Sequence, residues 1–468
     1  MHTDELHAHF GERYKWRVML TVMIGTMTMV LSATIVNVAL PTIMETYAVS
    51  HTGGQWLVTG FLASMAVGML MNAWLVERYG ARRTYLAALS LFAGVSLAGG
   101  LAVSFEMLVL VRVAQGLIAG VVQPLALLLI YSVFPVNQRG QAMGLYGMGV
   151  ILGPTFGPAM GGVLVDLISW RAVFFVVLPT CAYAFWLACR YLGQEQPEQR
   201  PQPMDLPGAL LLGGWLVALL WALANGSHLG WHSGVIIAAF TSFAVLFTAF
   251  ALRQLRSSAP LLALEVFRHP GFPAACLVAM LTGAGLFGSV YLLPLLVQIV
   301  LERSASTAGM VLIPAGLAMA VTFAIAGRLT DRVSPGAIAG TGMVLYAVSC
   351  LVLGFAGAGL SLLLITIMAA IGRMGLSLSM PPIMLQAIGS LPAGLVNQGT
   401  GVISFARQLG ASLGVTGTAI LLQERSGIMA GLGLPGASPG FQDAFLLFAV
   451  LFLIGLLPLS RLARASRR

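Results

Sequence analysis

Three arginines stand inside long apolar stretches of the sequence, where a charge is costly. Arg112, Arg373 and Arg407 each lie within such a stretch. A charge at the centre of a membrane-spanning helix costs at least about 2.5 kcal/mol, so it faces the interior of a helical bundle or a wet cavity. An arginine there can bind an anion or hydrogen-bond to backbone carbonyls. For Arg112, with Gln115 one turn further along, the sequence leaves both roles open.

No acidic residue lies as far inside an apolar stretch as these arginines do. The sequence has 15 Asp and Glu residues, and none falls in the middle of an apolar stretch. A buried carboxyl is a suitable proton carrier because burial raises its pKa towards neutrality. Interior arginines without interior acids favour a lipophilic anion as the molecule that they bind. Asp166, Glu106 and Glu77 are the remaining candidate proton carriers, although a structural role is favoured for each.

A glycine strip runs through the stretch GLYGMGVILGPTFGPAMGG, residues 144–162. Its glycines recur every fourth residue, which on a helix draws one continuous face where another backbone can come close. Two prolines share the interval, and a membrane helix tolerates them where neighbours satisfy the freed carbonyls. We predict a bent, closely packed hinge helix. Its residues are Gly149, Gly153, Pro154, Gly157, Pro158, Gly161 and Gly162.

The elements that position these residues follow from composition. Of the 468 residues 58% are hydrophobic and only 8% are charged, against roughly 25% charged in a soluble domain. Apolar runs of about 20 residues, enough to cross a bilayer, recur from end to end. We predict an all-α polytopic membrane protein with fourteen transmembrane helices. They are 17–40, 55–76, 84–103, 106–132, 142–165, 171–192, 208–226, 234–253, 272–298, 307–329, 337–356, 359–383, 400–422 and 443–463.

The distribution of basic residues orients these helices. With both termini on the cytoplasmic side, only Arg171, Arg303 and Arg425 fall in outward loops, and three more of the 24 Lys and Arg lie within helices. This inward excess is the positive-inside bias of membrane proteins. It accounts for the net charge of +9 without nucleic acid as a partner. We expect the predicted helices to be surrounded by the lipid bilayer.

The order of the helices suggests two repeated halves with an insertion between them. The polar run 193–207 reads as a linker without a core of its own. The expected segments are a tail (1–16), a six-helix bundle (17–192), the linker (193–207), two inserted helices (208–253), a connection (254–271), a second six-helix bundle (272–463) and a tail (464–468).

Charged residues recur at equivalent places in the two halves. An acid followed by arginine stands at the inner mouth of the second helix and of the tenth. We expect an inner gate of charge contacts there, with topology-setting charge as the alternative. Other polar residues lie within apolar runs, and we expect some to line a pathway and others to hydrogen-bond between helices. The gate residues are Glu77, Arg78, Arg82, Asp331 and Arg332; the pathway candidates include Ser32, Thr34, Asn37, Asn72, Gln123 and Gln298.

Several motifs resemble one family, the drug:proton antiporters of the major facilitator superfamily, in the fourteen-helix EmrB/QacA branch. SATIVNVALPTI (32–43) is similar to the first-helix element of that branch, and RVAQG (112–116) to its R-x-x-Q-G. The glycine strip resembles the antiporter signature, and RQLG (407–410) also resembles the branch. The resemblance covers nearly the whole chain.

The resemblance implies a bacterial inner-membrane exporter of lipophilic or amphipathic small molecules, working by alternating access and coupled to protons. It makes the glycine strip the seam between the two halves. It leaves open a periplasmic adaptor and an outer-membrane duct as partners, with the outer loop 425–442 as a contact.

Departures from the family pattern bear on coupling. Ser32 stands where the branch usually has an aspartate. The loop after the second helix resembles the family's G-x-x-x-D-R-x-G-R-[KR] motif, but Ala73 stands at its first glycine and Glu77 at its aspartate. The residues therefore do not support the proton coupling that the resemblance implies. A sensor or receptor on a transporter fold, and an uncoupled facilitator, stay open.

Enzyme chemistry is not indicated. The sequence shows no nucleophile–base arrangement, phosphate-binding glycine loop or metal-ligand cluster, and its four cysteines lie inside apolar segments without a CxxC pair. We expect no enzyme activity, no metal and no cofactor.

Overall fold

The computed structural model describes residues 11–49, 51–54, 56–193, 203–257, 260–269, 271–303, 305–356, 361–431 and 438–459, and its regular structure there is entirely helical. The longer helices are α2 (Tyr14–Tyr47), α4 (Trp56–Tyr79), α5 (Ala81–Gly100), α6 (Phe105–Val133), α7 (Arg139–Leu167), α8 (Ala172–Phe175) with α9 (Val177–Tyr191), α10 (Leu206–Leu229), α11 (Gly234–Arg256), α12 (Phe272–Leu295), α13 (Ala305–Thr330), α14 (Pro335–Phe355), α15 (Leu362–Gly389), α16 (Val396–Gly431) and α17 (Ser438–Ile454).

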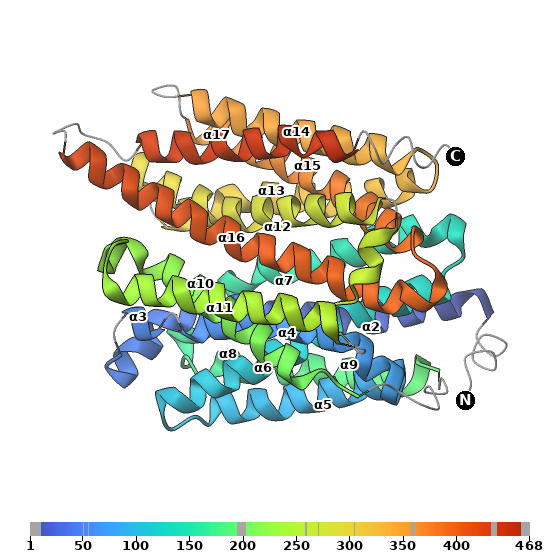
Figure 1. Ribbon diagram of the computed structural model, residues 1–468. Coiled ribbons are helices and arrows are strands. Elements are labelled where there is room, and N and C mark those ends of the chain that lie inside the picture. The colour runs from blue at the N-terminus through green and yellow to red at the C-terminus, as the bar shows by residue number, and fades with distance from the viewer. Residues whose placement is uncertain are drawn as a thin grey trace.

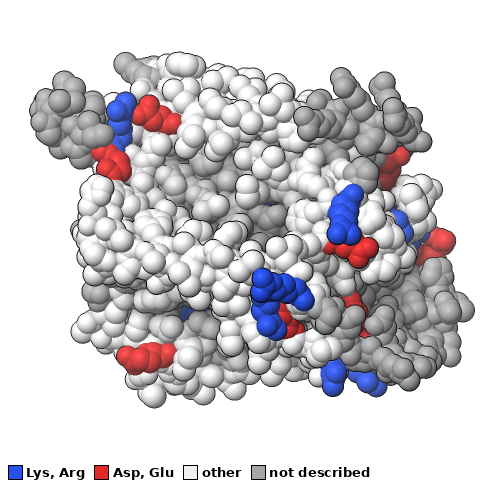
Figure 2. Space-filling view, viewed as in Figure 1, with Lys and Arg blue, Asp and Glu red and all other residues white. Residues whose placement is uncertain are grey.

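Each predicted span falls on one of these helices, with α8 and α9 together forming the sixth. Within the described residues, eleven helices are long and apolar enough to cross a membrane. The protein is therefore a multi-pass membrane protein, while the count of fourteen crossings stays a prediction. Most of the face shown in Figure 2 carries no charged side chain, as suits contact with lipid. Most of the linker 193–207, residues 1–10 of the expected N-terminal tail, the C-terminal tail 464–468 and part of the loop 425–442 lie outside the described residues.

The helices form two bundles that lie against each other (Figure 1). We call α2–α9 the N-terminal bundle and α12–α17 the C-terminal bundle. In the first, the Tyr85 hydroxyl of α5 donates to the Thr21 carbonyl of α2 over 3.0 Å. In the second, the Tyr346 hydroxyl of α14 donates to the Gly285 carbonyl of α12 over 2.8 Å. The same kind of bond thus joins equivalent helices, as expected of a repeat.

The inserted pair α10 and α11 lies between the bundles at the front of Figure 1. Leu212 and Trp215 of α10 belong to one buried cluster with Ala66 and Leu70 of α4 and with residues of the C-terminal bundle. At the loop between α10 and α11, the indole N–H of Trp231 donates to Glu424 of α16 over 2.6 Å. The insertion therefore rests on α4 and α16, one helix from each bundle.

Asp205 fastens the other end of this insertion. Its carboxylate accepts hydrogen bonds from the Gly208 amide at 2.9 Å, from Arg253 at 2.5 Å and from Gln254 at 3.0 Å. Burial by itself would raise the pKa of Asp205, but these hydrogen bonds and the Arg253 charge outweigh it and hold the pKa below its usual value. The residue both caps α10 and ties it to the end of α11.

The glycine strip packs within one bundle, not between the two. A Cβ added at Gly149 would lie 2.1 Å from Met23 Sδ, and one at Gly157 would lie 2.3 Å from Thr34 Oγ1, both on α2. Of the stretch 144–162, expected to be the seam between the halves, only the beginning, at Gly144 and Gly147, meets the other bundle. α7 runs unbroken through Pro154 and Pro158, and its bend stays a prediction.

The seam with the other bundle uses the first turns of α7 instead. A Cβ at Gly144 would lie 2.4 Å from the Phe323 carbonyl oxygen and 2.8 Å from the Cα of Gly327, both on α13. The C-terminal bundle repeats the plan, since Gly401 of α16 lies against the Met69 carbonyl of α4. The two bundles thus meet along α7–α13 and along α4–α16.

Candidate functional site

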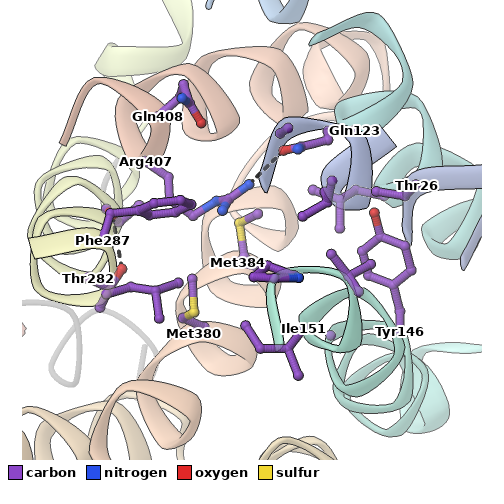
Figure 3. Close-up of a pocket in the computed structure, with 18 of the residues that line it drawn as sticks. Thr26, Gln123, Tyr146, Ile151, Thr282, Phe287, Met380, Met384, Arg407 and Gln408 are labelled. Carbon is purple, nitrogen blue, oxygen red and sulfur yellow. Dashed lines mark hydrogen bonds between the residues drawn. The ribbon is translucent and has the colours of Figure 1, made fainter. Parts of the chain in front are cut away.

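A cavity of about 150 Å³ lies between the two bundles (Figure 3). Residues of α2, α4, α6 and α7 line it from one side, and residues of α12, α13, α15 and α16 from the other. The lining is mostly apolar and rich in methionine, a flexible side chain that adapts to varied shapes. Its methionines are Met65, Met143, Met380 and Met384.

Arg407 is the charged residue of this lining. Its guanidinium donates to Gln123 Oε1 over 2.8 Å, so the bond runs from α16 to α6 and joins the two bundles across the cavity (Figure 3). Part of the Arg407 surface is accessible, and the cavity is the space that it faces. No acidic residue is among the described residues that line the cavity. The cavity therefore carries a net positive charge.

Most other polar side chains of the lining already donate hydrogen bonds within the protein. The hydroxyls of Thr26, Thr34 and Thr282 donate to carbonyls of their own helices, over 2.8, 3.1 and 2.9 Å. The Tyr146 hydroxyl points towards Thr26 (Figure 3). Arg407, Gln123 and Gln408 are thus the residues of the lining whose side chains can still donate to a bound molecule.

Two glycines fix the backbone of α16 around Arg407. A Cβ at Gly283 of α12 would lie 2.1 Å from the Arg407 carbonyl oxygen, and one at Gly410 would lie 1.9 Å from the Met280 carbonyl oxygen. Because the obstacles are backbone atoms, the helices could not pack this closely with alanine at either place. The close contact of α12 and α16 therefore positions the guanidinium in the cavity.

Arg112 is buried away from the cavity. Its side chain donates to the carbonyls of Leu57 at 3.0 Å and Ser32 at 3.3 Å, and to Gln115 Oε1 at 3.1 Å. Its guanidinium also lies 4.1 Å from the centre of the Phe61 ring. Of the two roles left open by the sequence, this geometry is that of a structural crosslink between α2, α4 and α6.

The other predicted pathway residues separate into different places. Arg373 is buried inside the C-terminal bundle and does not line the cavity, so of the three interior arginines only Arg407 lines it. Gln298 is exposed and donates to the Pro294 carbonyl over 3.2 Å. Of the first-helix candidates, Thr34 lines the cavity, Asn37 is exposed, and Ser32 is buried with its hydroxyl oxygen unpaired.

A direct contact joins the two bundles at the end where α2 begins and α17 ends, which we call the terminal end. Asp331, just after α13, accepts hydrogen bonds from the amides of Gly140 at 2.8 Å and Gln141 at 2.9 Å. These amides belong to the first turn of α7, where unpaired N–H groups and the helix dipole attract an anion. The carboxylate of one bundle thus caps a helix of the other.

The equivalent place on the other seam holds two asparagines. Asn72 of α4 donates to Asn397 of α16 over 3.3 Å, and Asn397 donates to the Ala73 carbonyl over 3.0 Å. The sequence singled out Asn72 as a polar residue in an apolar run, but nothing in it pointed to Asn397. The internal repeat could have found it, because it places the start of α16 opposite the end of α4.

The basic gate residues of the first half make their contacts inside the N-terminal bundle. Arg78 lies over the rings of Trp74 and Tyr79, and Arg82 donates to the Cys189 carbonyl over 2.8 Å, all within the N-terminal bundle. Arg332 is exposed, and Glu77 is half-buried at the end of α4. Asp331 contacts the other bundle at this end, but its partners there are backbone amides of α7, not a basic side chain.

Comparison with known proteins places this geometry in a family. A family model described as Major Facilitator Superfamily matches residues 22–415. The multidrug resistance protein Stp of Mycobacterium tuberculosis (strain CDC 1551 / Oshkosh) is 32% identical over 392 residues, covering 84% of this chain and 73% of Stp. The multidrug export protein EmrB of Haemophilus influenzae is 28% identical over 411 residues, covering 87% and 81%.

A solved structure shares the fold. The human organic anion transporter MFSD10 (TETRAN) superposes with a TM-score of 0.67 at 16% identity, covering 95% of this chain and 99% of that one. At this identity the likeness concerns the arrangement of helices alone.

Proposed function

This chain belongs to the major facilitator superfamily, and on that premise we propose that it exports lipophilic and amphipathic small molecules. The family is one of transporters, and two of the relatives above carry names that refer to multidrug resistance or export. The fold, two helical bundles around a shared cavity, suits alternating access, in which the bundles rock about a central site.

The observation that carries this proposal is the apolar cavity to which both bundles contribute. Drug-sized ligands occupy sites of about 300–1,000 Å³, so a cavity of about 150 Å³ must widen to hold one. The methionines of the lining can move to allow this. The expected cargo is therefore apolar in body and variable in shape.

We place the terminal end at the cytoplasm of a bacterial inner membrane. The bonds from Asp331 to α7 and from Asn397 to α4 hold that end shut. They would break when the bundles part to admit cargo. The strip of Gly149, Gly153, Gly157 and Gly161 would keep α2 and α7 moving together as one unit.

Ser32 favours a second candidate function, an uncoupled facilitator or a sensor. The serine is buried beside Arg112 where the branch usually has an acid, and its hydroxyl oxygen has no hydrogen-bond partner. A proton antiporter needs a group that titrates within its working range, and a serine hydroxyl does not.

Transport by the purified full-length protein in liposomes tests the proposal. A fluorescent lipophilic dye should cross faster with the protein than without it, and an imposed gradient should drive it against its own concentration. Movement only down the concentration gradient would support the facilitator. Absence of any movement, for every dye and gradient, would leave the sensor and refute both transport functions.

A further inference from the structure

We propose that Arg407 and Gln123 form a recognition site for anionic cargo, and that the membrane potential drives this cargo out of the cell. The inference rests on the proposed export function and names the class of molecule and the driving force. It starts from Arg407, the one charged side chain among the described residues that line the cavity.

The positive charge of Arg407 is not neutralised by a carboxylate of the described residues. No carboxylate among the described residues lies within ion-pair distance of it, and its bond to Gln123 is to a neutral amide. A cation held away from water without an anion is unfavourable, and a bound anion relieves this. An anionic molecule is therefore favoured over a neutral one of the same shape, and a cationic one is repelled.

The geometry of the pair suits a carboxylate, sulfonate or phenolate. A guanidinium has N–H donors in a planar fork, and Gln123 accepts from only one nitrogen, Nη2. The Gln123 amide can itself donate once it turns. An anion between the two could then accept hydrogen bonds from both, while its apolar part meets the methionines around it.

The position of the pair links binding to movement. Arg407 belongs to α16 of the C-terminal bundle and Gln123 to α6 of the N-terminal bundle. An anion that takes the place of Gln123 on Arg407 removes a bond between the bundles in the empty cavity. Because the anion replaces the direct bond with contacts to both residues, binding changes the connection between the bundles that alternating access must rearrange.

Transport of an anion would need no acidic residue in the first helix, because the membrane potential can drive it. Arg407 stays on α16, so each monovalent anion that leaves carries one net negative charge across the membrane. The inside-negative potential of a cell favours that movement. No proton has to travel on the protein, which agrees with Ser32 in the first helix and with the acid-free lining. Tyr146 is a titratable group close to Arg407.

Three probes with one fluorophore test the charge preference: dansylglycine as the anion, dansylamide as the neutral molecule and dansylcadaverine as the cation. The purified full-length protein is placed in liposomes at equal pH on both sides. Valinomycin and a potassium gradient of about 50-fold make the interior positive, which allows a monovalent anion to accumulate inside up to the same ratio. We expect dansylglycine to accumulate above the level in empty liposomes, and a pH gradient alone to produce no accumulation.

Variants then locate the site. Arg407→Gln should slow dansylglycine at least about tenfold, the value of one charge-assisted hydrogen bond, and leave dansylamide unchanged. Arg407→Lys should restore part of the anion transport because it keeps the charge. Arg328→Gln removes the same charge from an exposed position at the end of α13 and serves as the matched control.

The possible outcomes distinguish a failure of this inference from a failure of the proposed export function. Accumulation of dansylglycine with the pH gradient and not with the potential would overturn the inference, as would an equal loss of all three probes in Arg407→Gln. Transport of dansylcadaverine without dansylglycine would also overturn it, yet leave export standing. If the wild-type protein moves none of the three, both proposals are refuted.

Discussion

The carboxylate of Asp331 accepts a hydrogen bond from the backbone amide of Gly140 over 2.8 Å, and this bond joins the C-terminal bundle to the first turn of α7. Gly140 lacks a side chain at a place where a Cβ would lie 2.5 Å from Asp331 Oδ1. The acid can therefore reach the helix end directly. The closed terminal end depends on this pairing of a charge with a helix N-terminus.

Replacing Asp331 by Asn should weaken that closure. The amide keeps the size of the side chain but loses its charge, and caps of this kind contribute about 0.5–2 kcal/mol. We expect the terminal end to open more often, seen as a longer-distance population between spin labels placed on α7 and α13. Arg332→Gln, at the exposed neighbouring residue, should leave the distances unchanged. Identical distributions for wild type and Asp331→Asn would refute the role of this contact.

Gly144→Ala should prevent the bundles from closing along α7 and α13. The added methyl would lie 2.4 Å from a backbone oxygen of α13, which cannot move aside alone. We expect transport to fall by more than tenfold, a loss of about 1.4 kcal/mol or more in the barrier. Gly162→Ala is the matched control on the same helix, because no atom lies within 4 Å of its added Cβ. Equal activity of the two variants would show that the seam tolerates separation.

Ser32→Asp should introduce a dependence of transport on a pH gradient. The new carboxyl would lie next to Arg112, whose guanidinium already reaches the Ser32 carbonyl at 3.3 Å. A buried acid can bind and release a proton where a serine cannot. Dye transport in liposomes, with and without a pH gradient and at zero potential, measures the change. Ser32→Asn, which adds the same bulk without an acid, should not acquire the dependence.

The Asp205 network should make the inserted helices sensitive to acid. Because the pKa of Asp205 is lower in the folded protein, its contribution to stability is present above the unfolded value of about 3.9 and is lost as pH falls through the lower folded value. We expect Asp205→Asn to be less stable than wild type at neutral pH, by about 1–3 kcal/mol. The two proteins should converge in acid. Thermal unfolding across that pH range is the measurement, and a difference that persists at the lowest pH would contradict the account.

Much of the fold could be predicted because lipid imposes a simple rule on sequence. A run of about 20 apolar residues has to be a helix in the membrane, and each predicted run coincides with a helix of the structure. Helix ends were harder. α16 runs from Val396 to Gly431, beyond the apolar part on which its prediction rested, because a helix can continue past the lipid boundary.

The site was harder because a sequence shows how deep a residue lies but not which way it faces. Arg112, Arg373 and Arg407 are equivalent as charges within apolar helices, yet only Arg407 among them lines the cavity. The direction depends on close helix contacts, such as Gly283 against the Arg407 backbone, that join distant parts of the chain. The pair Asn72 and Asn397, which are 325 residues apart, was hidden for the same reason.

The inserted pair α10 and α11 makes the two seams between the repeated bundles different from each other. α10 covers the α4–α16 flank, and Trp231 secures the pair to Glu424 of α16. No such cover lies over the α7–α13 flank among the described residues. Of the two seams between the bundles, the α7–α13 seam is therefore the one that the insertion leaves uncovered, in the part of the chain that the structure describes.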